Sequence, residues 1–233
     1  MKMTKSAFKH SQNQMQHRHP IVPLTRTEEQ GRPGNLHPES DRCLRASVKA
    51  KATQGDYQGA IVLLTQLIDR HPNSAADYNN RGLIYFQSGE MDLAIADYNT
   101  ALQLNPHLDN AYNNRANYYA AEGKLAKAIE DYEIALDLNP TNIRAWINQG
   151  ITFRQMGQYS QALDNFDFAL HLGQLAGNIY AERGRTYHLW GDWNCAIADY
   201  RRALAHMSPS DATASLRLQV KTWMNHLLTP HYS

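Results

Sequence analysis

Blocks of 34 residues, laid end to end without gaps from Asp41, bring the same residue types into register five times. The fifteenth place of every block is glycine and the twentieth is alanine. These residues are Gly55, Gly89, Gly123, Gly157 and Gly191, with Ala60, Ala94, Ala128, Ala162 and Ala196. An internal repeat of this length predicts a single supersecondary unit that is copied along the chain, each copy packing against the next.

Small residues and a proline define the form of each block. Glycine at the fifteenth place can adopt the left-handed conformation that ends a helix. The small residues at the eighth and twentieth places allow two helices to approach closely. The eighth places are Val48, Gly82, Ala116, Gly150 and Gly184, and prolines that end the second helix are Pro72, Pro106 and Pro140. Each block is therefore predicted to be a helix-turn-helix hairpin.

Aromatic residues recur at three places of the block. They are Tyr78, Tyr112, Trp146 and Tyr180 at the fourth, Tyr85, Tyr119, Phe153 and Tyr187 at the eleventh, and Tyr98, Tyr132, Phe166 and Tyr200 at the twenty-fourth. Their spacing places them on the buried faces of the two helices. We therefore assign most of the tyrosines to the core and not to a base-stacking surface or a cofactor site.

This combination of a 34-residue period, aromatic and small residues in phase, glycine, alanine and terminal proline resembles the tetratricopeptide repeat (TPR) family. The sequence pattern "YNNRG…G…AIADY…AL.LNP" is similar to that of TPR arrays in bacteria, including cyanobacteria. Some of these TPR proteins are assembly factors. The resemblance implies an all-α fold, a right-handed superhelical solenoid of five helix-turn-helix repeats with a C-terminal capping helix. It also implies a concave groove, lined by the first helix of each repeat, that binds other proteins.

The repeat gives the expected domain boundaries. Residues 1–40 form a polar tail, predicted to be disordered because it has few aromatic or β-branched residues. Five repeats follow, at 41–74 (degenerate), 75–108, 109–142, 143–176 and 177–210. Residues 211–229 are predicted to form a capping helix, in which Leu216, Val220, Trp223 and Leu227 make one apolar stripe.

An arginine and an aspartate change together from block to block. Arg81, Arg115 and Arg183 stand at the seventh place of blocks whose twenty-third place is Asp97, Asp131 and Asp199. The fourth block has Gln149 with Asn165 instead. This covariation within one chain predicts an ion pair between the two helices of a hairpin. A bridge to the neighbouring repeat, or two separately exposed charges, are the alternatives.

Polar residues of the first helices are the candidate binding site. Asparagine recurs at the sixth place, where stacked hairpins would align it as a ladder whose amides could bond to an extended peptide backbone. The predicted peptide-binding residues are Arg45, Lys49, Asn80, Asn113, Asn114, Asn117, Arg144, Asn148, Arg154, Arg185 and His188. Their basic character favours an acidic segment or a free C-terminal carboxylate as the partner. Solvated polar surface is the alternative, and the resemblance to chaperone-binding carboxylate clamps is only partial.

Two tryptophans flank Gly191 at the predicted tip of the fifth hairpin. Trp193 stands where Tyr57 and Tyr159 stand in other blocks, whereas Trp190 stands where polar residues are usual. We expect Trp190 to pack on the capping helix; an exposed anchor for a partner is the alternative.

Several classes of function are not favoured by the sequence. Residues 41–233 hold 17 Lys/Arg against 19 Asp/Glu, and such a balance is not typical of a nucleic-acid-binding surface. No phosphate loop, nucleophile elbow or metal-ligand motif is present, so we expect no catalysis, no cofactor and no metal; His17 and His19 lack a third ligand. Cys43 and Cys195 are expected to be buried and reduced. No apolar run suits a signal peptide or membrane insertion, which favours the cytoplasm.

The function expected from the sequence is a protein-protein interaction scaffold or adaptor, such as an assembly factor, that binds an extended peptide in its groove. An RNA-binding helical-repeat protein is one alternative; it would need a basic stripe and exposed aromatic faces. A non-catalytic subunit of an enzyme complex is another. The sequence does not indicate an oligomeric state.

Overall fold

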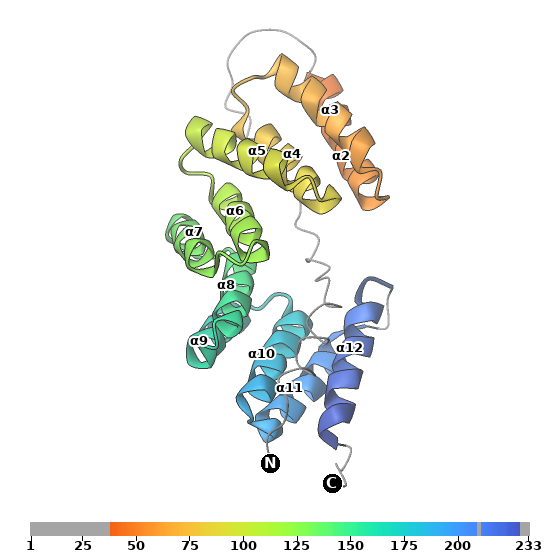
Figure 1. Cartoon of the computed structure of the whole chain (residues 1–233). Helices are drawn as coiled ribbons and strands as arrows, with labels where there is room; N and C mark the ends of the chain where they lie inside the picture. The colour runs from red at the N-terminus through yellow and green to blue at the C-terminus, as the bar shows by residue number, and fades with distance from the viewer. Residues whose placement is uncertain (1–37, 209–210, 229–233) are drawn as a thin grey trace.

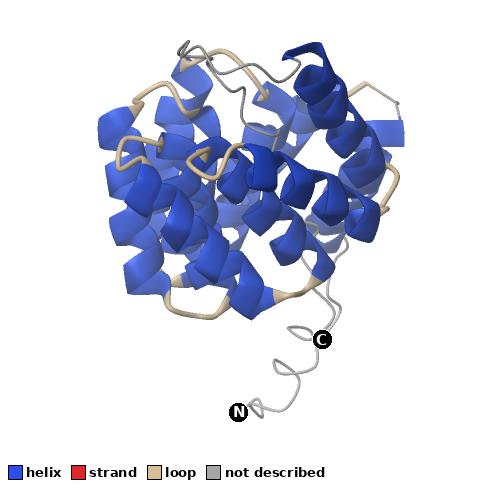
Figure 2. Cartoon of the chain, turned by 90° about the horizontal axis from the view of Figure 1, so that it is seen from above, coloured by secondary structure: helices blue, strands red, loops and turns tan. Residues whose placement is uncertain are grey.

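The computed structural model describes residues 38–208 and 211–228, and within these ranges the chain consists of helices joined by short loops, with no strand (Figures 1 and 2). The helices are α2 (Pro38–Thr53), α3 (Tyr57–Arg70), α4 (Ala75–Ser88), α5 (Met91–Leu104), α6 (Asp109–Ala121), α7 (Leu125–Leu138), α8 (Ile143–Gln155), α9 (Tyr159–His171), α10 (Ala176–Trp190), α11 (Trp193–His206) and α12 (Asp211–Leu228). The predicted all-α fold is confirmed.

Successive helices form five hairpins that stack into a solenoid (Figure 1). From α4 onward, each first helix contacts the first helix of the next hairpin, so that α4, α6, α8 and α10 follow one another. The second helices α7 and α9 lie on the outer side of the curve (Figure 1). We call the side formed by α2, α4, α6, α8 and α10 the inner face.

The turn of every hairpin depends on the glycine at the fifteenth place. The φ angles of the five glycines lie between 72° and 93°, in the left-handed region that other residues rarely adopt. In hairpin 2, Gly89 directly follows α4, and its backbone N–H bonds to the carbonyl oxygens of Tyr85 and Phe86. The glycine thus ends the first helix and turns the chain into the second.

Close packing inside a hairpin joins the eighth and twenty-fourth places. A Cβ atom added to Gly82 would lie 2.9 Å from the ring of Tyr98, and one added to Gly150 would lie 2.9 Å from the ring of Phe166. Both rings are fully buried. The small residue therefore makes room for the aromatic ring that fills the space between the two helices.

Helix α12 covers the open end of the last hairpin. Its Val220 is fully buried against Tyr200 and Ala203, and Leu216, Trp223 and Leu227 pack around the same cluster. The stripe expected from the sequence thus faces hairpin 5. Residue 229, the expected last residue of this helix, lies outside the described residues.

Several expectations need correction. Helix α2 already begins at Pro38, so residues 38–40 belong to the first hairpin and not to a disordered tail; the remainder of the predicted tail, His17 and His19 included, lies outside the described residues. Cys43 and Cys195 are exposed, not buried. Trp190 does not pack on the capping helix, since its ring stacks on Tyr159 of hairpin 4.

Candidate functional site

Each predicted arginine-aspartate pair is joined in the structure by a two-pronged contact. Arg81 donates to Asp97 through Nε at 2.7 Å and Nη2 at 2.9 Å. Arg115 contacts Asp131 in the same way, at 2.8 and 2.9 Å. The hydrogen bond to the aspartate, opposed by burial, raises the pKa of both arginines. These pairs hold the first helix of a hairpin on its second helix.

The same arginines also reach back to the preceding hairpin. Nη1 of Arg81 donates to Thr65 at 3.2 Å, and Nη1 of Arg115 donates to Asn99 at 2.9 Å. Both acceptors stand at the twenty-fifth place of the block before. The sequence left open whether the arginine bonds within its own hairpin or to the neighbouring one. In the structure, one arginine side chain makes both contacts.

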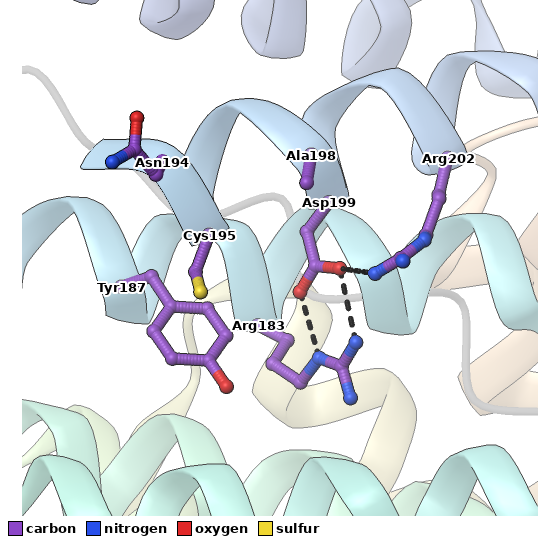
Figure 3. Close-up of a pocket in the computed structure, with 7 residues that line it drawn as sticks. All are labelled: Arg183, Tyr187, Asn194, Cys195, Ala198, Asp199 and Arg202. Atoms are coloured by element: carbon purple, nitrogen blue, oxygen red, sulfur yellow. Dashed lines mark hydrogen bonds and ion pairs between the residues drawn. The ribbon is translucent and has the colours of Figure 1, made fainter. Parts of the chain in front are cut away.

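The third pair lies beside a small cavity of about 270 Å³ between α10 and α11. Figure 3 shows the Asp199 carboxylate between the guanidinium groups of Arg183 and Arg202. Arg183 donates to Asp199 at 2.7 and 2.9 Å and also bonds to Asp167 of α9. Burial opposes the charge of Arg183, but these hydrogen bonds raise its pKa above the ordinary value. The charged groups of this cavity are thus engaged with one another.

Hairpin 4 lacks the arginine contact. Gln149 and Asn165 take the places of the pair, and both are buried. The side-chain nitrogen of Asn165 bonds to the carbonyl oxygen of Gln161, while its Oδ1 has no hydrogen-bond partner among the described residues. The boundary between hairpins 3 and 4 is instead held by apolar packing, by the bond from Asn142 to Asp109 at 2.8 Å, and by the asparagines described next.

The asparagines of the inner helices do not form an open ladder, and this corrects the sequence-based expectation. Asn114 donates its side-chain amide to Asn79 at 3.0 Å, and Asn148 donates to Asn113 at 3.2 Å. Asn113 in turn donates to Asn114 at 3.4 Å. The result is one chain of amides that crosses α8, α6 and α4.

Burial explains why these amides pair with each other. The exposed fraction of Asn113 and Asn114 is 1% each, and Asn80, Asn117 and Asn148 are also buried. Asn117 accepts a hydrogen bond from the hydroxyl of Tyr132 at 2.6 Å. Because the inner helices contact one another directly, a sixth place lies against the fifth place of the hairpin before it. The Nδ2 atom of Asn79 has no hydrogen-bond partner among the described residues, but it is buried as well, so these asparagines lie within the stack and not on a surface that a peptide could reach.

Two of the predicted basic residues are also occupied within the chain. Arg45 donates to the buried Asp77 at 3.0 and 3.2 Å, which joins hairpins 1 and 2. Arg154 pairs with Glu182 at 2.8 Å and bonds to its carbonyl oxygen, which joins hairpins 4 and 5. Asp77 was not identified from the sequence, because an acid in the first turn of a helix is common at exposed sites.

Three predicted cations have no carboxylate partner among the described residues. Lys49 is exposed, and Arg144 is half-buried with no hydrogen-bond or ion-pair partner within the described chain. Burial lowers the pKa of Arg144. Arg185 lies over the ring of Trp223 at 5.1 Å and contacts Nδ1 of His188 at 3.4 Å.

The positions of these cations place them on the inner face. Arg144 lies one turn before Asn148, whose side chain points to the neighbouring inner helix α6. Arg185 stands three residues after Glu182, which meets Arg154 of the inner helix α8. At the same end, His188 lies 3.1 Å from the Tyr200 hydroxyl, and burial together with Arg185 and His226 lowers its pKa.

The described residues offer neither a metal site nor a membrane-spanning helix. They contain no group of three or more His, Cys, Asp or Glu side chains arranged to hold a metal ion. None of the helices in residues 38–208 and 211–228 combines the length and apolar character that a bilayer span requires.

Comparison with protein families gives matches to tetratricopeptide repeat models at residues 46–74, 75–108, 110–142 and 132–164. The chain belongs to the tetratricopeptide repeat family. This TPR chain is also similar to solved structures, among them TTC0263, a thermophilic TPR protein of Thermus thermophilus, with 18% identity and a TM-score of 0.70 over 79% of this chain and 99% of that one.

Two further solved structures share the TPR fold. The pilF protein of Pseudomonas aeruginosa has 16% identity and a TM-score of 0.66, over 81% of this chain and 89% of the other. MamA has 21% identity and a TM-score of 0.57, over 68% of this chain and 92% of the other. At these identities the likeness concerns the fold alone. The TPR repeats themselves support a protein-interaction scaffold as the general class of function.

Proposed function

We propose that this TPR protein is a scaffold that holds an extended, acidic segment of a partner protein against its inner face. The observation that carries the proposal is that some cations of the inner face pair with an acid of the next hairpin, whereas others do not. Arg45 and Arg154 are neutralised by buried or half-buried acids of the next hairpin. Arg144 and Arg185 have no such acid among the described residues.

The position of Arg144 costs free energy in two ways. A half-buried guanidinium loses hydration, and a cation in the first turn of α8 lies at the positive end of the helix dipole. No described residue offsets these costs. A carboxylate from a partner would offset both, because it would pair with the guanidinium and also face the helix N-terminus.

The spacing of the cations suits an elongated ligand. Lys49 belongs to hairpin 1, Arg144 to hairpin 4 and Arg185 to hairpin 5. A partner that meets more than one of them must extend along the stack of inner helices. Recognition would then come from charged side chains or a C-terminal carboxylate, because the buried asparagines are engaged with each other.

The RNA-binding alternative receives less support from the same structure. The rings at the twenty-fourth place, such as Tyr98 and Tyr132, are fully buried and thus cannot stack on bases. The arginines of the three pairs are engaged with aspartates. An oligonucleotide would therefore meet few free cations and few free aromatic faces.

A binding experiment with peptides of matched length tests the proposal. Extended acidic, neutral and basic peptides are titrated against the wild-type protein and a variant in which Arg144 and Arg185 are both changed to Gln. We expect selective binding of the acidic peptide, weakened on the order of tenfold in the variant. The control combines Arg201→Gln with Lys221→Gln, which removes the same two positive charges from exposed positions of α11 and α12.

Photo-crosslinking locates the bound peptide. A crosslinking residue at Asn110 or Asn178 stands at the same place as Arg144 in the neighbouring hairpins, and one at Arg201 serves as the outer-face control. Crosslinks from the inner positions alone support the groove. Equal affinity of the three peptides, equal affinity of the Arg144/Arg185 variant, or tighter binding of single-stranded RNA would overturn the proposal.

A further inference from the structure

The tip of hairpin 5 exposes two tryptophans. Trp190 is 53% exposed and Trp193 is 62% exposed, whereas Trp146 and Trp223 are half-buried. Exposed indole rings lose the free energy that burial would supply, and tryptophan is the residue most enriched at binding hot spots. Both lie at the tip of hairpin 5, where α10 ends and α11 begins.

The repeat explains why Trp193 is uncovered. Trp190, at the fourteenth place of hairpin 5, stacks on Tyr159, at the seventeenth place of hairpin 4, with ring centroids 6.2 Å apart. Trp193 is the seventeenth place of hairpin 5, so the residue that would stack on it belongs to a sixth hairpin. Helix α12 follows instead, and it packs on Tyr200 and Ala203. Tyr159 is thus covered by the indole of the next hairpin, whereas Trp193 has no following hairpin to cover it.

The two indoles border one depression at the surface. It measures about 550 Å³ and is lined by Trp190, Gly191, Asp192, Trp193 and Asn194. Asp192 is the one charged residue among these five. Hydrogen bonds from the backbone N–H of Cys195, and further contacts with Cys195, lower the pKa of Asp192, so it is anionic at neutral pH.

The chemistry of the lining selects for a cation. The faces of indole rings are electron-rich and attract ammonium groups, most strongly for tryptophan among the aromatic residues. The Asp192 carboxylate adds a full negative charge beside them. The neighbouring cavity of Figure 3 differs, because its Asp199 is already engaged by Arg183 and Arg202.

We propose that the depression between Trp190 and Trp193, which we call the tip pocket, binds the alkylammonium group of a lysine side chain on a partner protein. The ammonium lies over the indole of Trp193 and beside Asp192, and the aliphatic stem lies on Trp190. Methylation of the lysine strengthens binding, because a methylated ammonium loses less hydration on contact with an indole face. The tip pocket acts separately from the inner face.

Titration with three peptides that differ only at one residue tests this proposal. The central residue is lysine, trimethyllysine, or the neutral carbon isostere of trimethyllysine, and binding to the full chain is followed by calorimetry and tryptophan fluorescence. We expect the order trimethyllysine, lysine, isostere. Trp193→Ala is expected to weaken trimethyllysine binding roughly two- to fivefold.

A charge variant separates electrostatics from loss of fold. Asp192→Asn keeps a side-chain oxygen that can accept the Cys195 N–H at the start of α11 but removes the charge, so it is expected to weaken the cationic peptides and leave the isostere unchanged. The matched aromatic control is Trp146→Phe in hairpin 4. Circular dichroism verifies that each variant keeps its helix content.

The peptide titrations can either support or overturn the tip pocket. Equal affinity for trimethyllysine and its neutral isostere, or unchanged affinity in both Trp193→Ala and Asp192→Asn, overturns the tip pocket. So does a loss of cation binding in the Arg144/Arg185 variant equal to that in Trp193→Ala, because the cation would then bind elsewhere. Weaker binding in Trp193→Ala and Asp192→Asn, but not in the Arg144/Arg185 variant, supports the tip pocket. This conclusion does not depend on whether acidic peptides bind the inner face.

Discussion

Arg115 and Asp131 form a parallel two-bond contact across hairpin 3, at 2.8 and 2.9 Å, while the remaining guanidinium nitrogen of Arg115 reaches Asn99 in hairpin 2. A single planar side chain thus sets both the angle within a hairpin and its position on the one before. Arginine suits this role better than lysine, because its donors lie in a fixed fork.

Removal of the arginine from this contact is expected to destabilise the protein. Arg115→Met leaves the buried Asp131 carboxylate without its partner, and we expect the free energy of unfolding to fall by about 2 to 4 kcal/mol. Urea denaturation measures the change. The control is Arg201→Met, an exposed residue of α11, which should cost far less. An unchanged midpoint for Arg115→Met would show that the contact contributes nothing.

The missing contact in hairpin 4 is expected to be restorable. Gln149→Arg with Asn165→Asp recreates the pair, and Glu133 stands at the place that Asp167 occupies before Arg183. Asn165→Asp alone buries an unpaired charge and should destabilise. A double-mutant cycle in urea is expected to give a favourable coupling of about 1 to 3 kcal/mol. Additive effects of the two changes would contradict this geometry.

The buried amide chain is expected to support stability. Asn113→Ala removes the acceptor of the Asn148 amide, and leaving a buried donor unpaired costs about 1 to 3 kcal/mol. Asn110→Ala, on the same helix, serves as control because Asn110 is only half-buried and bonds weakly to the adjacent Asp109. If the two variants unfold at the same urea concentration, the amide chain is not stabilising.

Stability near the cap is expected to depend on the charge state of His188. An unfolded histidine titrates near pH 6.5, whereas burial, Arg185 and His226 lower the pKa of His188 in the folded protein. The unfolded chain therefore binds the proton more readily. The contribution is fully present above about pH 6.5 and is lost as the pH falls through the folded pKa.

This dependence is measured by urea unfolding at pH 7.5 and pH 5.0, followed by tryptophan fluorescence. His188→Gln should reduce the difference between the two pH values, because glutamine does not titrate. A wild-type difference that persists unchanged in the variant would assign the pH dependence to other groups.

Much of the fold could be predicted because its causes are local and repeated. Glycine at the turn, a small residue opposite an aromatic ring, and proline after the second helix each act within one 34-residue block, and five blocks in phase make the signal strong. The start of α2 at Pro38 was missed because the first block is degenerate and its leading residues lack this pattern.

The candidate site was predicted less well, for a physical reason. The repeat shows that Asn114 and Asn148 stand at the sixth place and Asn79 and Asn113 at the fifth, but not whether these places meet water or another helix. The inner helices contact one another directly, so the amides are buried and pair together. The residue type gives no sign of this, because an asparagine side chain can hydrogen-bond in either environment.

The sequence alone determined the helix-turn-helix unit and its period, and it favoured the pairing of arginine with aspartate, because these depend on contacts inside a single hairpin. Only the tertiary structure decided which polar residues pair with a neighbouring hairpin and which have no such partner among the described residues. That outcome depends on how closely neighbouring hairpins stack. It gave Arg45 and Arg154 acids of the next hairpin, left Arg144 without one among the described residues, and left Trp193 exposed.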